Sequence, residues 1–221
     1  MASACRRLHA RGLLAGAEGN ISVRLADGDL LVTPSGVDKG TIKGEDILHL
    51  EMLGAEYPRR ALDHEAHRAR RDNPRRPSSE LGMHRACYDA RHDVFAVVHA
   101  HPPAATGLAT AGHSLPGDVL PELPVVVGPV ALVPYARPGT PALGDAMKPF
   151  LPGHDAFLLA NHGVTTVGVT LEEALLRLET VEQAARILVV ARLLGGERRL
   201  TPEEAEVLGT LRVRPQSSSY E

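Results

Sequence analysis

The sequence predicts an α/β fold of one domain, with helices covering the faces of a mixed or largely antiparallel sheet. Its 221 residues suit one domain with a single hydrophobic core. Short apolar runs of strand length alternate along the chain with longer helical patterns. An early hairpin, in which two apolar-alternating runs flank Asp27-Gly28, argues against a purely parallel sheet.

Turn residues and capping residues divide the first half of the chain into elements. In order we expect a helix at 3–15, hairpin strands on both sides of Asp27-Gly28, a strand at 46–51, a helix at 63–71, a helix from Pro77 to about Asp89 and a strand at 94–101. Gly16 and Gly19 end the first helix. The serines of Pro77-Ser78-Ser79-Glu80 are good N-caps, and an acid in the first turn suits the helix dipole.

The second half continues this alternation and contains the longest helix. We expect a helix at 104–111, one or two short strands within 124–133, a helix at 140–150, a strand at 156–160 that 164–167 extends, a helix at 170–194 and a last short helix from Thr201. Apolar residues from Leu171 to Leu188 recur at steps of three and four, and Thr170 caps that helix. Residues 1–221 are therefore read as one domain, with a polar, mobile tail at 212–221.

Composition and charge exclude several classes of function. The net charge is −3 and the isoelectric point is about 6.4, so no overall field favours nucleic acid or a membrane surface. Two cysteines, Cys5 and Cys87, make no disulfide framework and indicate a reducing compartment. The sequence shows neither a signal peptide nor an apolar span of membrane length, so we expect a cytoplasmic protein.

Two histidines one residue apart, His99 and His101, end the apolar strand of VFAVVHAHPP. Because side chains alternate across a strand, both point the same way. A third, His162, stands in FLLANHGV. Neutral imidazoles that meet at one point are typical zinc ligands, and three of them leave a fourth position for chemistry. Spacing alone leaves metal ligands and hydrogen-bonded strand histidines as equally open alternatives.

Three polar loops accompany the histidines, namely Gly19-Asn20-Ile21-Ser22, Thr33-Pro34-Ser35-Gly36 and Ser78-Ser79-Glu80. Hydroxyls, an amide and glycine N–H groups suit a phosphate, although each loop alone is also an ordinary turn or cap. Two roles are open for Glu80 as well. It either stabilises the helix through its dipole or, if this helix start faces the histidines, transfers protons on a metal-bound substrate.

The motifs GNISVR, TPSG, PSSE, VVHAHPP and NHGV, in this order, resemble the class II aldolase/adducin family from about Gly19 to Leu194. The resemblance implies one three-layer α/β domain, a central, mostly antiparallel sheet between helical layers. It also implies a homotetramer with active sites between subunits. A zinc ion would be held by His99, His101 and His162, with Mn²⁺ or Co²⁺ as possible substitutes. Glu80 matches the catalytic acid, which can also occupy the metal in the resting state.

The same resemblance implies a small sugar phosphate as the substrate. The positions that match its phosphate-binding residues are Gly19, Asn20, Ser35, Gly36, Ser78 and Ser79. The implied reaction cleaves a ketose 1-phosphate, of the fuculose-1-phosphate kind, into dihydroxyacetone phosphate and an aldehyde. A metal-stabilised enediolate would form, and Glu80 would protonate it at carbon.

Other members of the family provide the alternatives. A sugar-phosphate 4-epimerase is disfavoured because those enzymes carry Asp where this chain has Glu80. A decarboxylase or dehydratase stays open. A non-catalytic, adducin-like interaction module is disfavoured because all three histidines are present. The family's aldolases also use tyrosines, which segment 113–123 lacks, so Tyr220 is only a candidate for the second proton transfer. His84, at i+4 from Glu80, either orients that carboxylate or packs.

Overall fold

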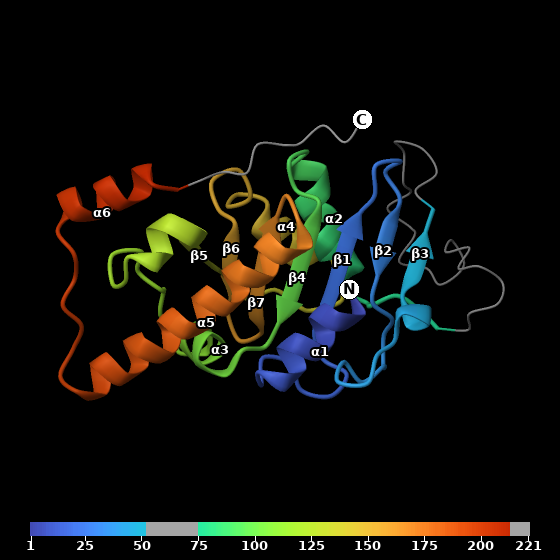
Figure 1. Ribbon diagram of the computed structural model, residues 1–221, viewed down its shortest axis with the longest axis horizontal. Helices are drawn as coiled ribbons and strands as arrows, with labels where there is room; N and C mark the ends of the chain where they lie inside the picture. The colour runs from blue at the N-terminus through green and yellow to red at the C-terminus, as the bar shows by residue number, and fades with distance from the viewer. Residues whose placement is uncertain (52–74, 213–221) are drawn as a thin grey trace.

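A seven-stranded sheet is the centre of the structure, a computed structural model that describes residues 1–51 and 75–212 (Figure 1). Its strands, in the order in which they lie side by side, are β3 (Leu48–Leu50), β2 (Leu30–Val32), β1 (Asn20–Arg24), β4 (Ala96–Ala100), β7 (Gly163–Gly168), β6 (Ala156–Leu159) and β5 (Val130–Val133). Neighbours are antiparallel except β5 and β6. The expected hairpin and the mostly antiparallel sheet are thus confirmed.

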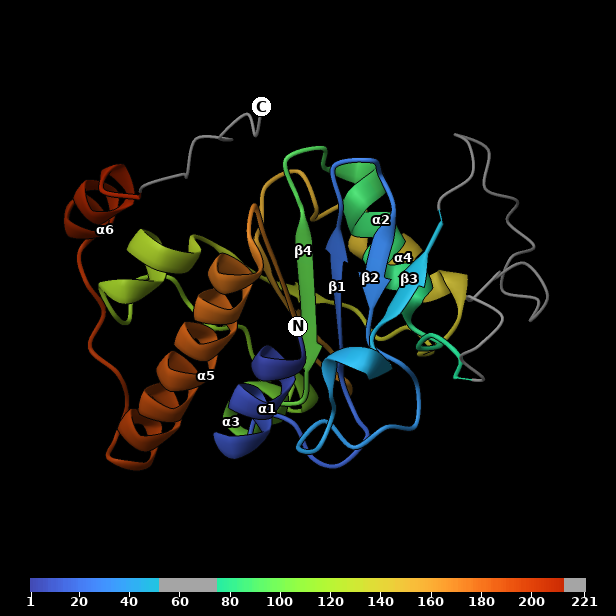
Figure 2. The ribbon, with the colours of Figure 1, turned by 45° about the vertical axis from the view of Figure 1, so that its right-hand side comes forward.

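Helices cover both faces of this sheet and make a three-layer domain (Figure 2). The helices are α1 (Ala2–Ala10), α2 (Leu81–Ala90), α3 (Pro103–Thr110), α4 (Pro141–Met147), α5 (Leu171–Leu193) and α6 (Pro202–Thr210). Helices α1, α3 and α5 pack on one face, and α2 and α4 pack on the other. The three-layer α/β fold predicted from the family resemblance is confirmed.

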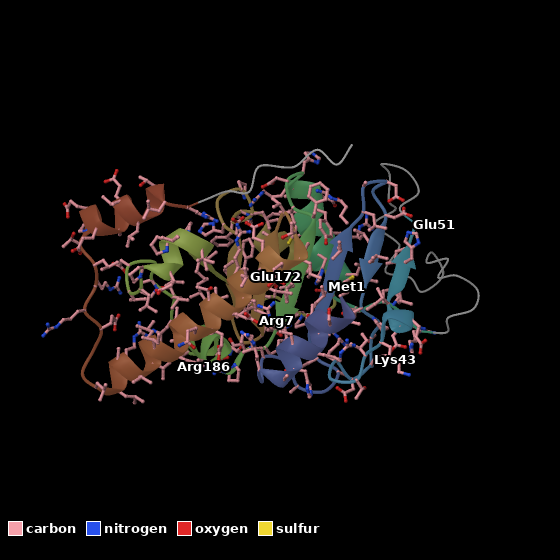
Figure 3. The ribbon with its side chains drawn as sticks, viewed as in Figure 1. Met1, Arg7, Lys43, Glu51, Glu172 and Arg186 are labelled. Carbon is pink, nitrogen blue, oxygen red and sulfur yellow. The ribbon has the colours of Figure 1, made fainter. Side chains whose placement is uncertain are left out.

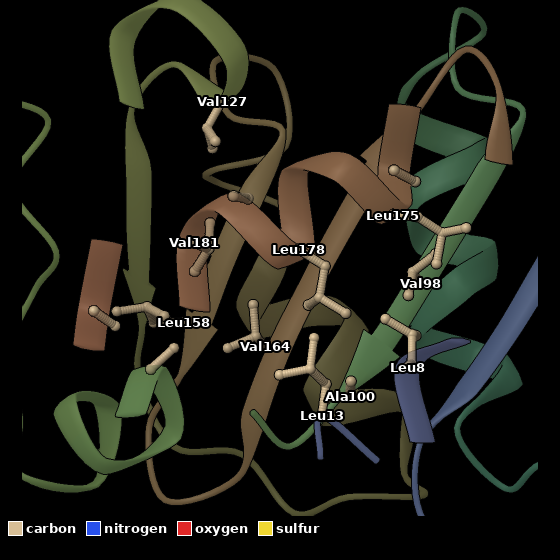
Figure 4. Packing of buried hydrophobic residues seen from close by; sticks show 14 of the residues in the cluster. Leu8, Leu13, Val98, Ala100, Val127, Leu158, Val164, Leu175, Leu178 and Val181 are labelled. Atoms are coloured by element: carbon tan, nitrogen blue, oxygen red, sulfur yellow. The ribbon is translucent and has the colours of Figure 1, made fainter. Parts of the chain in front are cut away.

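The longest helix supplies much of one core layer. Leu175, Leu178 and Val181 of α5 are buried against the sheet, where Val98 and Val164 meet them (Figure 4). The Thr170 side chain accepts a hydrogen bond from the Glu173 N–H, so the expected N-cap of this helix is confirmed. Such a cap contributes about 1 kcal/mol. The apolar stripe therefore fixes α5 to the strands that carry the histidines.

Ion pairs attach the first helix to the longest one. Arg7 of α1 lies 2.6 Å from Glu172 and 2.8 Å from Glu179 of α5 (Figure 3). The two segments are more than 160 residues apart in sequence. The pairs add specificity to a contact whose main free energy comes from buried apolar side chains such as Leu8.

Several boundaries differ from the sequence prediction for local reasons. Helix α1 ends at Ala10, because Gly12 follows with a φ of 68°. The first half of 124–133 forms a π-helical turn, η2 (Leu123–Val127), so only β5 is a strand there. Strand β7 does not extend β6 but pairs antiparallel with it after a turn at Asn161, whose φ is 55°.

The serines before α2 do not act as predicted. Glu80 occupies the N-cap position of this helix, and no side chain caps it. The Ser78 hydroxyl instead accepts the Glu80 N–H at 3.3 Å and the Asn20 amide at 3.0 Å. The hydroxyl therefore connects loops rather than starting the helix.

Two predictions fall on parts of the chain that the structure does not describe. The helix expected at 63–71 lies outside the described residues, as do positions 213–221 of the predicted tail. Arg212, the first residue of that tail, is described and pairs with Asp155. Among the described helices, none combines the length and apolar character needed to cross a bilayer.

A buried polar network joins β1 to α2. His84 is 2% exposed, and its Nδ1 accepts the hydroxyl of Ser22 at 2.7 Å, while Ser22 accepts the hydroxyl of Tyr88 at 2.7 Å. The other ring nitrogen, Nε2, then donates to the Asn20 side-chain oxygen. Burial lowers the pKa of His84 to about 4, although the charge of Glu80 opposes this shift. A neutral imidazole satisfies the network with one donor and one acceptor.

Replacing His84 with Gln should make the stability of the metal-free protein less sensitive to pH. The folded pKa of His84 lies below the 6.5 of a free imidazole, so the unfolded chain takes up a proton first as the pH falls. The free energy of unfolding that neutral His84 contributes therefore falls progressively from about pH 6.5 towards pH 4. At pH 5 the loss is about 2 kcal/mol. Urea unfolding at several pH values measures it. His113→Gln, an exposed control, should keep the wild-type slope, and the same slope in His84→Gln would contradict the assignment.

Candidate active site

The site lies at one end of three neighbouring central strands, where β1 and β7 begin and β4 finishes. Strand β4 runs antiparallel to both β1 and β7, and its residue His99 pairs with Asn20 on one side and Thr165 on the other. His101 follows directly after β4, and His162 stands in the turn before β7. The register of the sheet thus brings distant parts of the sequence together.

The structure brings all three predicted histidines into one cluster. Their ring centroids are 5.0 Å apart for His99 and His101, 4.7 Å for His99 and His162, and 5.3 Å for His101 and His162. One nitrogen from each ring lies within 4.8 Å of the other two. This arrangement is compatible with a metal ion.

Hydrogen bonds behind the rings decide which nitrogens face the centre. The Nδ1–H of His99 donates to the Val164 carbonyl at 3.0 Å, and the Nδ1–H of His101 donates to the Glu18 carboxylate at 3.1 Å. A carbonyl and a carboxylate only accept, so each ring proton must be on Nδ1. Both Nε2 atoms then carry bare lone pairs, as metal-binding imidazoles require.

The predicted carboxylate lies beside these nitrogens. The two oxygens of Glu80 are 2.9 Å from His162 Nε2 and 3.4 Å from His99 Nε2. Burial alone would raise the pKa of Glu80, but the proximity of His162 and His99 and the hydrogen bond from the Asn20 amide together hold this pKa well below its usual range. Burial also lowers the pKa of His99 to about 3, with Glu80 opposing, which favours its neutral form.

The chemistry of this donor set fits a cation. The Nε2 atoms of His99 and His101 face each other at 3.1 Å, and neither has a proton to share in the neutral tautomers fixed above. A carboxylate adds further lone pairs to the same space. Such a concentration of acceptors is stabilised by a positive ion at its centre. His162 Nε2 faces the same space at 2.9 Å from Glu80, and its Nδ1 has no hydrogen-bond partner among the described residues.

Asn20 connects the carboxylate to the buried network behind it. Its side-chain oxygen accepts from His84, so its amide nitrogen must point the other way. That nitrogen donates to Glu80 at 2.8 Å and to Ser78 at 3.0 Å. His84 therefore orients Glu80 through Asn20 rather than by direct i+4 contact. Both amide hydrogens of Asn20 are used within the protein.

The three predicted phosphate loops converge next to the histidines. Pro34 forms a bridge with Pro77, and the Ser35 N–H donates to the Arg76 carbonyl at 2.8 Å. These bonds place the Ser35-Gly36 turn beside the Ser78-Ser79 segment, which Asn20 already contacts. The hydroxyl of Ser35 lies on an exposed residue, as expected for a group that can reach a ligand.

A cavity of about 350 Å³ joins the histidine cluster to these loops. Its lining residues are Ala17, Glu18, Gly19, Asn20, Pro34, Ser35, Lys39, Ser78, Ser79, Glu80, His101, Pro138 and His162. A larger hollow of about 710 Å³ near α6 has no histidine or serine in its lining. The smaller cavity is therefore the one that most of the predicted site residues line.

Two glycines allow the strands to approach this closely. A Cβ on Gly163 would lie 2.5 Å from the ring of His101 and 2.7 Å from the Ala100 carbonyl. A Cβ on Gly19 would lie 2.7 Å from the His99 carbonyl, and its φ of 68° already favours glycine. Glycine at both positions is thus part of how the imidazoles are placed.

Sequence reasoning missed the residues that support the site. Glu18 orients His101 from 83 positions away, and Glu182 of α5 accepts the N–H groups of Ala104 and Ala105, at the start of the helix that follows His101. Neither carboxylate belongs to a local motif, so no spacing in the sequence pointed to it. The candidate Tyr220 lies outside the described residues.

Comparisons with known proteins agree with this geometry. Residues 1–189 match the family model described as Class II Aldolase and Adducin N-terminal domain. A 3-oxo-tetronate 4-phosphate decarboxylase of Haemophilus influenzae is 31% identical over 190 residues, which cover 82% of this chain and 81% of that protein. A 5-deoxy-D-ribulose 1-phosphate aldolase of Bacillus thuringiensis is 32% identical over 205 residues, which cover 92% and 89%.

A solved structure is also similar to this chain. An L-fuculose 1-phosphate aldolase superposes with a TM-score of 0.78 at 31% identity, covering 95% of this chain and 92% of that one. The chain therefore belongs to the class II aldolase and adducin family.

Proposed function

We propose that this protein is a zinc-dependent aldolase that cleaves a ketose 1-phosphate into dihydroxyacetone phosphate and an aldehyde. One observation carries the proposal: the Glu80 carboxylate lies 2.9 Å and 3.4 Å from two imidazoles of a three-histidine cluster, at the end of a cavity lined with hydroxyls. Relatives that act as sugar-phosphate aldolases support it.

His99, His101 and His162 would hold the metal. When bound, the ion would supply Lewis-acid stabilisation of the negative charge that develops on the substrate oxygens. The protein's own part begins with the orientation of the imidazoles by Val164 and Glu18, which keeps their Nε2 lone pairs directed inward. Zinc is the proposed native metal because imidazole nitrogen suits it, with Mn²⁺ or Co²⁺ as substitutes.

Glu80 would carry the proton at the reacting carbon. As the C3–C4 bond breaks, its electron pair stays on C3 as an enediolate, the C4 hydroxyl gives its proton to the Glu80 carboxylate, and C4 departs as the aldehyde. Glu80 would then deliver that proton to C3 and return to the carboxylate form. In condensation the carboxylate would remove the same proton. The amide of Asn20 holds one oxygen of Glu80 at 2.8 Å and so keeps the group aimed at the cavity.

The polar loops would bind the phosphate at the other end of the substrate. Gly19, Ser35, Ser78 and Ser79 line the cavity and offer hydroxyls or backbone N–H groups, and Gly36 follows Ser35 in the same turn. Asn20 shapes this loop rather than offering free hydrogens, since both are already donated.

A phosphorylated 3-oxo acid is the second candidate substrate, favoured by the decarboxylase relatives. Loss of CO₂ from such an acid leaves the same electron pair beside the same carbonyl. With 3-oxo-tetronate 4-phosphate as the acid, a proton that Glu80 takes from water and delivers to that carbon would again give dihydroxyacetone phosphate. The two reactions thus share the machinery described here and differ only in the group that leaves.

The remaining parts of the proposal concern assembly and location. A homotetramer is supported by Val190, Leu193 and Leu194, which are 54%, 82% and 83% exposed at the end of α5. A cytoplasmic location is supported by the two free, buried cysteines.

Incubating the zinc-loaded protein with a panel of ketose 1-phosphates should release dihydroxyacetone phosphate and an aldehyde from at least one of them. Coupled reduction of the triose phosphate measures the release. A phosphorylated 3-oxo acid, tested in parallel with CO₂ detection, is the comparison. Release of CO₂ with no cleavage of any ketose would select the decarboxylase, and epimerised sugar without triose phosphate would select the epimerase.

Replacing His99 with Ala should reduce bound zinc from about one ion per chain by at least tenfold, because the remaining ligands no longer complete the site. Metal analysis after gel filtration measures the ion. The matched control is His113→Ala, on an exposed histidine, which should retain full zinc content. Full zinc content and turnover in the His99 variant would contradict the assignment.

Replacing Glu80 with Gln should lower kcat by about 10²- to 10⁴-fold, because the amide cannot transfer the proton. Zinc content should stay near that of the wild type, since the imidazoles remain. Exposed Glu51 provides the control variant Glu51→Gln, which should behave as wild type. An unchanged kcat in Glu80→Gln would remove this residue from the mechanism.

A further inference from the structure

The proposed reaction gives no role to Lys39, a buried charged side chain beside the candidate phosphate site. Lys39 is 1% exposed and is among the largest fully buried side chains of the described chain. Its Nζ lies 2.9 Å from the Val37 carbonyl, 3.2 Å from that of Ala17 and 3.4 Å from that of Pro34. Three acceptors require three hydrogens, which an ammonium has and a neutral amine lacks.

These carbonyls lie in or directly next to two of the loops that surround the candidate phosphate site. Pro34 and Val37 flank Ser35-Gly36, and Ala17 stands two residues before Gly19. The Lys39 N–H also donates to the Gly16 carbonyl at 2.9 Å. The ammonium therefore lies directly behind both loops, and Lys39 lines the same cavity as Ser35 and Ser78.

The positive charge of Lys39 is poorly balanced by its surroundings. No carboxylate within residues 1–51 and 75–212 forms an ion pair with it. Burial lowers the pKa of Lys39, and Asp38, which opposes this shift from an exposed position, uses its carboxylate to accept the Gly40 N–H. The nearby Cys5 thiol stays neutral, because burial raises its pKa to about 11. Neutral oxygens satisfy the hydrogens but leave the charge itself uncompensated.

Acidic side chains line the same cavity as Lys39. They are Glu18 and Glu80, which lie beside the imidazoles. An anion that entered the cavity near these groups would be repelled unless a cation faced it. Lys39 is the cation placed behind the loops that would receive the anion.

We infer that Lys39 is a specificity-determining residue, whose buried charge makes the cavity select the phosphate ester of the substrate over the corresponding neutral sugar. This inference rests on the proposed function. Because all three ammonium hydrogens are donated to carbonyls, Lys39 acts through its field across the loops rather than by touching the phosphate. The phosphate dianion would complete the charge balance that the protein leaves open.

The matched ligands that test it are dihydroxyacetone phosphate and dihydroxyacetone, which differ only in the phosphate. Calorimetric titration of zinc-loaded wild type, Lys39→Met and Lys39→Arg measures both affinities. Lys39→Met should weaken binding of the phosphorylated ligand by at least about tenfold and leave that of the neutral ligand within about twofold. Lys39→Arg, which keeps the charge, should retain most of the preference.

Each other outcome has a distinct meaning. An equal loss for both ligands in Lys39→Met would make Lys39 a loop support only, and an undiminished preference would also overturn the inference. If Lys39→Met does not fold, Lys39→Gln takes its place. A Lys39→Gln variant that prefers dihydroxyacetone phosphate over dihydroxyacetone as strongly as the wild type does would likewise overturn the inference. A wild type that binds both ligands alike would instead refute the proposed function.

Discussion

The placement of His99 between two antiparallel strands is the constraint on which the site depends. Its ring donates through Nδ1 to the Val164 carbonyl of the neighbouring strand, and Thr165 lies within 3.1 Å of the same nitrogen. The opposite nitrogen must then face the cluster without a proton. A slip of one residue in the β4–β7 register would turn His99 to the other face of the sheet and remove both the imidazole and its orienting bond. The packing of α5 on these strands protects that register.

The parts of the site that follow from local periodicity could be predicted from the sequence. His99 and His101 share a direction because side chains alternate along a strand, and the hairpin at Asp27-Gly28 is confirmed for similarly local reasons. Ser78 and Ser79 were expected to cap the helix. In the structure the Ser78 hydroxyl instead accepts a hydrogen bond from the Asn20 amide, a tertiary contact that the local sequence does not indicate. Asn161, in a left-handed conformation that asparagine tolerates, separates β6 from β7, where the apolar pattern alone read as one continuous strand.

Long-range electrostatic partners could not be predicted in this way. Glu18 meets His101, and Asn20 meets both His84 and Glu80, only because the sheet and α2 bring them together. The outcome is a cavity whose lining carries both kinds of charge, the carboxylates of Glu18 and Glu80 and the ammonium of Lys39 behind the loops. A substrate with a metal-binding oxygen pair and a phosphate matches this lining. Aldol cleavage and decarboxylation both use such a substrate, which agrees with relatives of both kinds.

The central claim is that three imidazole nitrogens and the Glu80 carboxylate share one metal ion. X-ray absorption at the zinc edge of the purified protein measures this coordination most directly. The account predicts three nitrogen ligands at about 2.0–2.1 Å and one oxygen ligand in the resting protein, with added oxygen contacts once dihydroxyacetone phosphate is bound. Coordination that includes sulfur, or that keeps three nitrogens in a His162→Ala variant, would contradict it.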